Sequence, residues 1–257
     1  MDDSIKQTLI DIVGRENFTD MLIDLVSYSY DASDHDHRPA GAVWVNSAEE
    51  VSRILMTANT HRFPVTPRGA GTGLAGAAVP AVGGLVLDLS RMNRILDIRI
   101  VDRLVVVQPG VVYADLESAL EPYGFFFPPD PASGSVCTLG GNVATNAGGL
   151  RGAKYGVTRD YVMALELVLA DGSVIHTGTR TAKGVVGYDL TRLMVGSEGM
   201  LGVVTRITLK LIPRPEAEGV LIAFFPVAKS ASNTVVSLFE SRILPRCAEF
   251  LDKLSIE

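Results

Sequence analysis

The segment from Pro67 to Gly76 constrains this chain more than any other feature of its sequence. It reads Pro-Arg-Gly-Ala-Gly-Thr-Gly-Leu-Ala-Gly, with glycines at 69, 71, 73 and 76. Glycine lacks a Cβ and adopts backbone conformations closed to other residues, so successive N–H groups of such a loop can point at one anion. The segment therefore predicts a phosphate-binding loop. A glycine-rich loop without a ligand is the alternative, and it would lose more conformational entropy than an ordinary turn requires.

The last three of these glycines also fit the spacing G-x-G-x-x-G of a nicotinamide-binding turn. That turn lies between a strand and a long helix. Here Pro64 and Pro67 crowd the entry, and Pro80 with Gly83 and Gly84 leaves no room for a helix. No Gly-Lys-Ser/Thr follows, which excludes a nucleoside triphosphate loop. The surrounding sequence therefore excludes both a nicotinamide-binding turn and a nucleoside triphosphate loop.

Two further clusters have the composition of a ligand site. Pro128 to Ser133 is a rigid entry to Thr138 to Gly149, a run of mostly small residues against which a flat ring can lie. Thr138, Asn142, Thr145 and Asn146 offer hydrogen bonds there, although a tightly packed helix start would have a similar sequence. Gly196 to Val204 is a glycine-rich turn before a strand, a pattern that an ordinary turn also shows.

The overall composition excludes several classes of protein. Hydrophobic residues make up 47% of the 257 residues and charged residues 20%, which is typical of a folded globular protein. A net charge of -6, with no run of Lys or Arg, argues against nucleic acid as a partner. The chain has neither a signal-like start nor a transmembrane segment, so we expect a cytoplasmic location, with import into an organelle and processing as the open alternative. Cys137 and Cys247 form no disulfide or zinc pattern.

Periodicity predicts mixed helix and strand. Ser47 to His61 is expected to be a helix capped by Ser47 and Glu50. The Asp171-Gly172 dipeptide predicts a tight hairpin turn. A second helix is expected at 113–120, and strands at 43–45, 63–65, 85–89, 104–108, 162–170, 173–176 and 203–211.

The segment from Pro213 to Glu218 is a polar, proline-containing joint that predicts a domain boundary. We expect one domain at 1–215, with subdomains at about 35–95 and 96–215. Beyond the joint, a strand at 220–225, a helix near 229–244 and a strand starting at 249–251 are expected. So few elements predict that residues 216–257 begin a second domain whose remainder is absent.

In this order and spacing, the clusters resemble the PCMH-type FAD-binding domain of the vanillyl-alcohol oxidase and p-cresol methylhydroxylase superfamily. The likeness is greatest to the FAD-linked D-lactate dehydrogenases and the flavin subunit of glycolate oxidase, and it covers about Asp31 to Pro215. The segments that carry it are 28–31, 67–76, 128–149, 154–156 and 196–199. The resemblance implies an α+β fold in which two α+β subdomains clasp FAD, followed by the start of a ferredoxin-like substrate domain.

The resemblance also implies the cofactor-binding residues. The pyrophosphate is expected at Arg68, Gly69, Ala70, Gly71, Thr72 and Gly73, and the neighbouring Pro67 and Leu74 are also expected to contact the cofactor. The flavin is expected at Pro131, Ser135, Thr138, Gly140, Gly141, Asn142, Ala144, Thr145 and Asn146, and the adenine at Gly202, Val203 and Val204.

The catalytic residues are harder to assign. Relatives place a cluster of His and Glu, which often binds a divalent metal, far downstream of the last residue here, so no metal site is expected. His35, His37, His61 and His176 do not replace that cluster. Arg151 lies in Leu-Arg-Gly-Ala, where relatives often carry Pro and Cys or His, and it is a possible ligand for a substrate carboxylate.

The resemblance implies an FAD-dependent oxidoreductase that oxidises a D-2-hydroxy acid of the D-lactate or glycolate class by hydride transfer to flavin N5. This chain would mainly be its FAD-binding part. The implied partners are the hydroxy acid and an electron acceptor, which is an iron–sulfur protein, a cytochrome or a quinone. Two alternatives stay open: a sugar or alcohol flavoenzyme of the same superfamily, and a flavin-binding electron-relay subunit without a substrate site.

Overall fold

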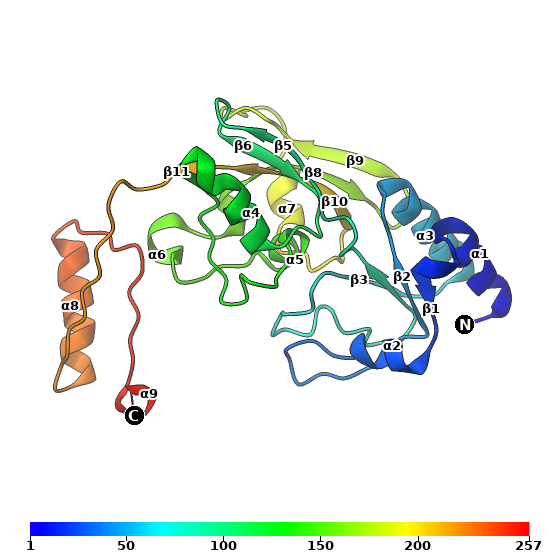
Figure 1. Cartoon of the computed structure of the whole chain (residues 1–257), viewed down its shortest axis with the longest axis horizontal. Coiled ribbons are helices and arrows are strands. Elements are labelled where there is room, and N and C mark those ends of the chain that lie inside the picture. The colour runs from blue at the N-terminus through cyan, green and yellow to red at the C-terminus, as the bar shows by residue number, and fades with distance from the viewer. Residues whose placement is uncertain (257) are drawn as a thin grey trace.

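A computed structural model describes residues 1–256, and its two main sheets lie side by side (Figure 1). The first sheet has the order β1-β2-β4-β3, built from β1 Phe18–Thr19, β2 Gly41–Trp44, β3 Val65–Arg68 and β4 Leu85–Asp88. The second has the order β5-β6-β10-β8-β9, built from β5 Ile95–Arg99, β6 Leu104–Val107, β8 Val162–Val168, β9 Val174–Gly178 and β10 Val203–Lys210. A small third pair joins β7 Phe125–Phe126 to β11 Ile212–Pro213.

The α-helices are α1 Asp3–Val13, α2 Leu22–Ser27, α3 Ala48–His61, α4 Tyr113–Leu120, α5 Leu139–Thr145, α6 Gly152–Tyr155, α7 Leu190–Met194, α8 Ala228–Glu240 and α9 Lys253–Ile256. Short 3₁₀ turns lie at Arg15–Asn17, Glu121–Tyr123 and Thr158–Asp160. The mixture of helix and strand confirms the α+β expectation. None of the described helices is long and apolar enough to cross a lipid bilayer.

The first sheet is parallel around β4, and α3 is the connection between β2 and β3. Ser47 caps α3 by accepting a hydrogen bond from Glu50 N, and Glu50 in turn accepts one from Asn46 N at 2.7 Å. The predicted cap is confirmed. Val51 and Ile54 on its buried face pack against Leu85 and Leu87 of β4 in one core.

Strand β3 starts two residues later than the predicted 63–65 and includes Pro67. Proline has no N–H to donate, which confines it to a strand with one unpaired side. β3 is such a strand, because it lies at the edge of the sheet and pairs only with β4. The phosphate-binding loop predicted at 67–76 therefore begins at the open edge of the first sheet.

The second sheet is antiparallel throughout. The predicted hairpin joins β8 to β9, with Gly172 at a φ of +86°. Residues of α4, α5 and α7 pack in one core with this sheet. At the hairpin, Ser52 Oγ of α3 donates to Gly172 O at 2.5 Å. Val168 and Val203 of this sheet are buried in the core of the first one, so the two sheets are packed together rather than merely linked.

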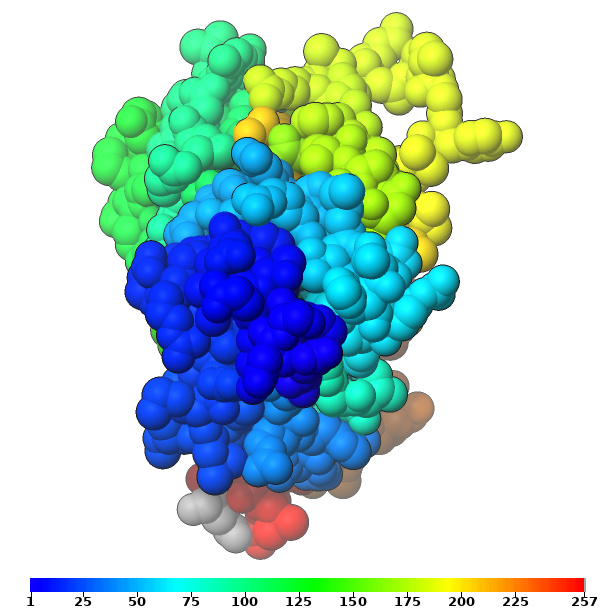
Figure 2. Space-filling view, turned by 90° about the vertical axis from the view of Figure 1, so that its right-hand side faces the viewer, coloured from blue at the N-terminus to red at the C-terminus, as the bar shows by residue number. Residues whose placement is uncertain are grey.

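Two regions lie outside these cores. The loop at 179–189 between β9 and α7 projects from the body (yellow in Figure 2), and Tyr188 in it is 96% exposed. The segment from residue 214 onward carries α8, which stands apart from the sheets and has no buried residue (Figure 1). The strands expected at 220–225 and 249–251 were a wrong prediction. A strand needs a hydrogen-bonded neighbour, and neither segment has one among residues 1–256.

Candidate functional site

The three glycine-rich clusters meet around one cavity of about 590 Å³. Its walls include Pro67 to Leu74 from the first cluster and Gly202, Val203 and Val204 from the third. The second cluster contributes Pro131, Thr138, Gly140, Gly141, Asn142, Ala144 and Thr145. Segments more than a hundred residues apart in the sequence are thus brought to one place.

The loop after β3 presents free backbone donors to this cavity. Within the described chain, the amide groups of residues 69–75 donate to no protein acceptor. The loop is held instead by its carbonyls, since Gly73 O accepts from Ala32 N and Gly76 O from Val79 N. No helix follows before β4, which agrees with the rejection of a nicotinamide-binding turn. Free amides in a glycine-rich loop are the kind of group that binds anions in proteins.

Helix α5 brings the second cluster against this loop. Thr138 is its N-cap, and Thr138 Oγ1 accepts from Gly141 N at 3.3 Å. A Cβ at Gly69 would overlap Thr138 Oγ1, and one at Gly140 would lie 2.5 Å from Pro109 Cβ. The loop, the helix and the turn at Pro109 thus approach each other closely only because glycine occupies these positions.

Two buried polar atoms on the cavity wall have no partner in the described structure. They are Asn142 Nδ2 and Asp31 Oδ2, and both residues are buried. Burial tends to raise the pKa of Asp31, but hydrogen bonds from Ser33 outweigh it and hold that pKa below its ordinary value. An unpaired buried donor or acceptor costs free energy. A bound ligand that pairs with both atoms recovers it, so the cavity is chemically suited to a polar ligand that offers both a donor and an acceptor.

Several wall residues were not foreseen as ligands. Asp31 lay in a segment used only for the resemblance, and Ser197 and Glu198 lay in the third cluster without an assigned role. Leu89 and Met194 also line the cavity. They resemble ordinary core residues, and no sequence signal distinguishes them.

Three expected residues do not line the cavity: Ser135, Asn146 and Arg151. Asn146 ends α5 in the left-handed conformation, and its side chain accepts from Arg159 N at 2.9 Å. Ser135 and Arg151 line a second cavity of about 590 Å³ instead. Pro131 and Ala132 line both cavities and form the wall between them.

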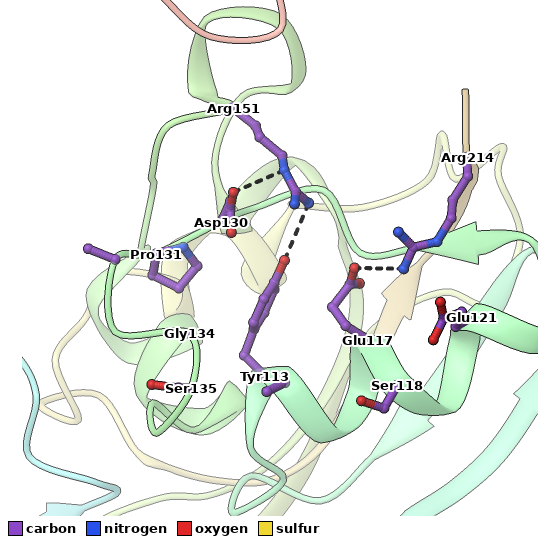
Figure 3. A pocket seen from close by; sticks show the side chains of 12 residues that line it. Tyr113, Glu117, Ser118, Glu121, Asp130, Pro131, Gly134, Ser135, Arg151 and Arg214 are labelled. Carbon is purple, nitrogen blue, oxygen red and sulfur yellow. Dashed lines mark hydrogen bonds and ion pairs between the residues drawn. The ribbon is translucent and has the colours of Figure 1, made fainter. Parts of the chain in front are cut away.

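Figure 3 shows that charged groups of the second cavity are paired with one another. Arg151 Nε lies 3.0 Å from Asp130 Oδ2, and its Nη1 donates to Tyr113 OH at 3.4 Å. Arg214 Nη2 lies 3.1 Å from Glu117 Oε2. Burial raises the pKa of Glu117, and Arg214 opposes that rise. The guanidinium of Arg151 thus has its counter-ion within the protein.

The described residues contain no group of three or more His, Cys, Asp or Glu placed to hold a metal ion. His176 lies on β9, away from the cavity walls, with its Nε2 3.0 Å from Glu166 Oε2.

Comparison with known proteins agrees with this geometry. The model of the family described as FAD binding domain matches residues 39–178. The glycolate oxidase subunit GlcD of Bacillus subtilis is 47% identical over 250 residues, which are 97% of this chain and 53% of that protein. The D-lactate dehydrogenase of Anaerostipes hadrus is 43% identical over 84% of this chain and 45% of that protein. The chain thus spans about half the length of these curated relatives.

Solved structures share the fold at low identity. An alkyldihydroxyacetonephosphate synthase superposes with a TM-score of 0.82 at 22% identity, over 96% of this chain and 47% of that one. A p-cresol methylhydroxylase with substrate bound gives 0.81 at 22% identity, over 93% and 49%.

We predict that the unpaired amide of Asn142 contributes nothing to the stability of the ligand-free chain. Asn142→Leu replaces an unpaired buried donor by an apolar group of similar size, so it should cost less than about 0.5 kcal/mol or be stabilising. Thr138→Val is the matched control, because it removes a paired N-cap oxygen from the same helix and should cost about 1 kcal/mol. Urea denaturation without ligand measures both. A larger loss for Asn142→Leu than for Thr138→Val would contradict the interpretation.

Proposed function

This chain belongs to the FAD binding domain family, and from that premise we propose that it supplies the FAD-binding half of an oxidoreductase acting on a D-2-hydroxy acid. The observation that carries the proposal is the convergence of three glycine-rich clusters on one cavity with free donors. Relatives named glycolate oxidase subunit and D-lactate dehydrogenase support a substrate of the glycolate or D-lactate class.

We assign the cofactor to the cavity by the chemistry of its walls. The free amides of residues 69–75 would hold the pyrophosphate, since N–H groups that point at one place bind anions. Asn142 would donate to the flavin from α5, where Thr138 and Thr145 also line the wall. Gly202, Val203 and Val204 at the start of β10 would face the adenine. Ser135 and Asn146 drop out of this assignment, because neither lines the cavity.

Bound FAD would supply the redox chemistry, by accepting a hydride from the α-carbon of the acid at flavin N5. The protein must then fix the substrate carboxylate and remove the hydroxyl proton. The ionisable residues on the cavity wall are Asp31, Arg68, Cys137 and Glu198. Asp31 and Arg68 are buried, and burial raises the pKa of the Cys137 thiol, which keeps it protonated.

Arg151, the residue expected at the substrate, lies beyond the shared wall and is paired with Asp130. No residue described here combines a carboxylate-binding role with that of a base. We therefore propose that these groups come from outside the 257 residues, and that electrons pass from the flavin to an iron–sulfur protein, a cytochrome or a quinone. A flavin-binding relay subunit is the second candidate, favoured by the same observation that no described residue combines the two roles.

The first test asks whether FAD binds at the loop of residues 69–75. Gly73→Val adds a side chain where no protein atom lies within 4 Å and where φ is not positive. The chain should fold normally, and the new side chain should meet the cofactor and weaken FAD binding about tenfold or more, which is about 1.4 kcal/mol. Gly152→Val is the matched control, since it is equally open but lies in α6, outside the cavity. Titration of flavin fluorescence measures both, and equal FAD affinity for the two variants would exclude the loop from the site.

The second test asks whether this chain, loaded with FAD, oxidises a hydroxy acid by itself. We expect FAD-loaded protein, mixed anaerobically with D-lactate or glycolate, to keep its flavin oxidised for minutes, while dithionite bleaches it at once. General acid–base help is worth about 10² to 10⁴ in rate, so its absence should be conspicuous. The absorbance near 450 nm, roughly where oxidised flavin absorbs, reports the result. Rapid bleaching by either acid would show that the catalytic base lies within this chain.

A further inference from the structure

Arg68 is the last residue of β3 and the first charged group before the anion-binding loop, yet its side chain is buried. Its guanidinium donates to three backbone carbonyls, which belong to Tyr30 at 2.8 Å, Ala78 at 3.1 Å and Ser27 at 3.4 Å. Two of these carbonyls lie at the end of α2 and just beyond it, and the third lies at the far end of the loop. One side chain thus joins three points of the backbone that the sequence keeps apart.

The groups around this guanidinium stabilise a positive charge. Its Cζ lies 5.5 Å from the centre of the Tyr28 ring, a distance at which an aromatic face attracts a positive charge. Tyr28 OH donates to Asp88 Oδ2 at 2.7 Å, and the buried carboxylates of Asp88 and Asp31 offset the buried charge. A buried cation is costly unless its donors and its charge are matched. Here three carbonyls accept from the guanidinium and two carboxylates offset part of its charge, while burial holds the pKa of Arg68 below its ordinary value.

The loop folds directly over this group. A Cβ at Gly71 would overlap Arg68 Nη2 and lie 2.7 Å from its Cζ. Gly71 also has a φ of +69°, in the left-handed region that other residues adopt at a cost. The path of residues 69–78 is therefore defined by the guanidinium beneath it, and glycine at 71 is required by the protein itself as well as by any ligand.

We propose that Arg68 is a positioning residue: its guanidinium is the internal template on which the loop at 69–78 folds, and the backbone amides, rather than this charge, bind the pyrophosphate. The inference rests on the proposed function only for the identity of the anion, because the template can be tested without FAD. Lysine cannot substitute, since an ammonium is a compact point charge without the planar fork that reaches three separate carbonyls.

A double-mutant cycle between Arg68 and Gly71 tests the template in the ligand-free protein. Gly71→Ala is compared in the natural background and in Arg68→Met, with the equilibrium constant of unfolding measured in urea. The overlap exists only when the guanidinium is present. The factor by which Gly71→Ala raises the equilibrium constant of unfolding should therefore be roughly tenfold larger in the natural background than in Arg68→Met. Should Arg68→Met fail to fold, Arg68→Lys serves as the second background.

Gly83→Ala is the matched control, because Gly83 has a φ of +71° but no atom within 4 Å of its Cβ position. It should have the same effect in both backgrounds. A Gly71→Ala effect that is also the same in both backgrounds would overturn the proposal.

FAD affinity then separates a template from a direct phosphate ligand. If Arg68 shapes the loop, Arg68→Lys and Arg68→Met weaken FAD binding to a similar extent. An Arg68→Lys variant that keeps affinity near that of the natural chain, while Arg68→Met loses it, would show that the charge itself binds phosphate and would overturn the proposal. Failure of the natural chain to bind FAD would instead refute the proposed function and leave the result of the cycle standing.

Discussion

The structure depends on the close packing of glycine backbone against neighbouring residues where the loop after β3 and the turn at Pro109 meet the start of α5. Gly69 lies against Thr138, and Gly140 lies against Pro109, with no room at either place for a Cβ. These contacts bring the glycine-rich loop after β3 of the first sheet beside the N-terminus of α5, which packs in one core with the second sheet. The hydrogen bond from Ser52 to Gly172 and the shared burial of Val168 hold the two sheets together at a second place. The cavity exists because both contacts are satisfied at once.

The site is kept at a cost to the ligand-free protein. Asn142 Nδ2 and Asp31 Oδ2 lie buried without partners. A sequence selected only for stability would pair or remove such groups. Their common position on one cavity wall is explained by a ligand that supplies the missing partners. The charges of Arg68 and Arg151, by contrast, are already matched by carboxylates and carbonyls of the protein.

Local signals in the sequence were sufficient for much of the fold and the cavity. The Ser47 cap and the Asp171-Gly172 turn each act over a few residues, and both predictions were confirmed. The glycine-rich segment lines the cavity, and its phosphate-binding role stays a prediction. Predictions that depended on contacts with distant parts of the sequence were less accurate. The segment at 220–225 has strand composition but no neighbouring strand. Arg151 lies beside Asp130 and behind Pro131, which spacing alone does not reveal. Leu89 and Met194 line the cavity only because the two sheets pack together.

Hydrogen–deuterium exchange with and without FAD tests most directly whether the three clusters form one cofactor site. Amides of residues 69–75 are free in the structure, so FAD should slow their exchange strongly. Slower exchange is also expected at 138–146 and 196–204, which come from the other subdomain, while α8 should be unchanged because it packs against neither sheet. Protection confined to one of the three clusters, or no protection at 69–75, would contradict a single FAD site between the sheets.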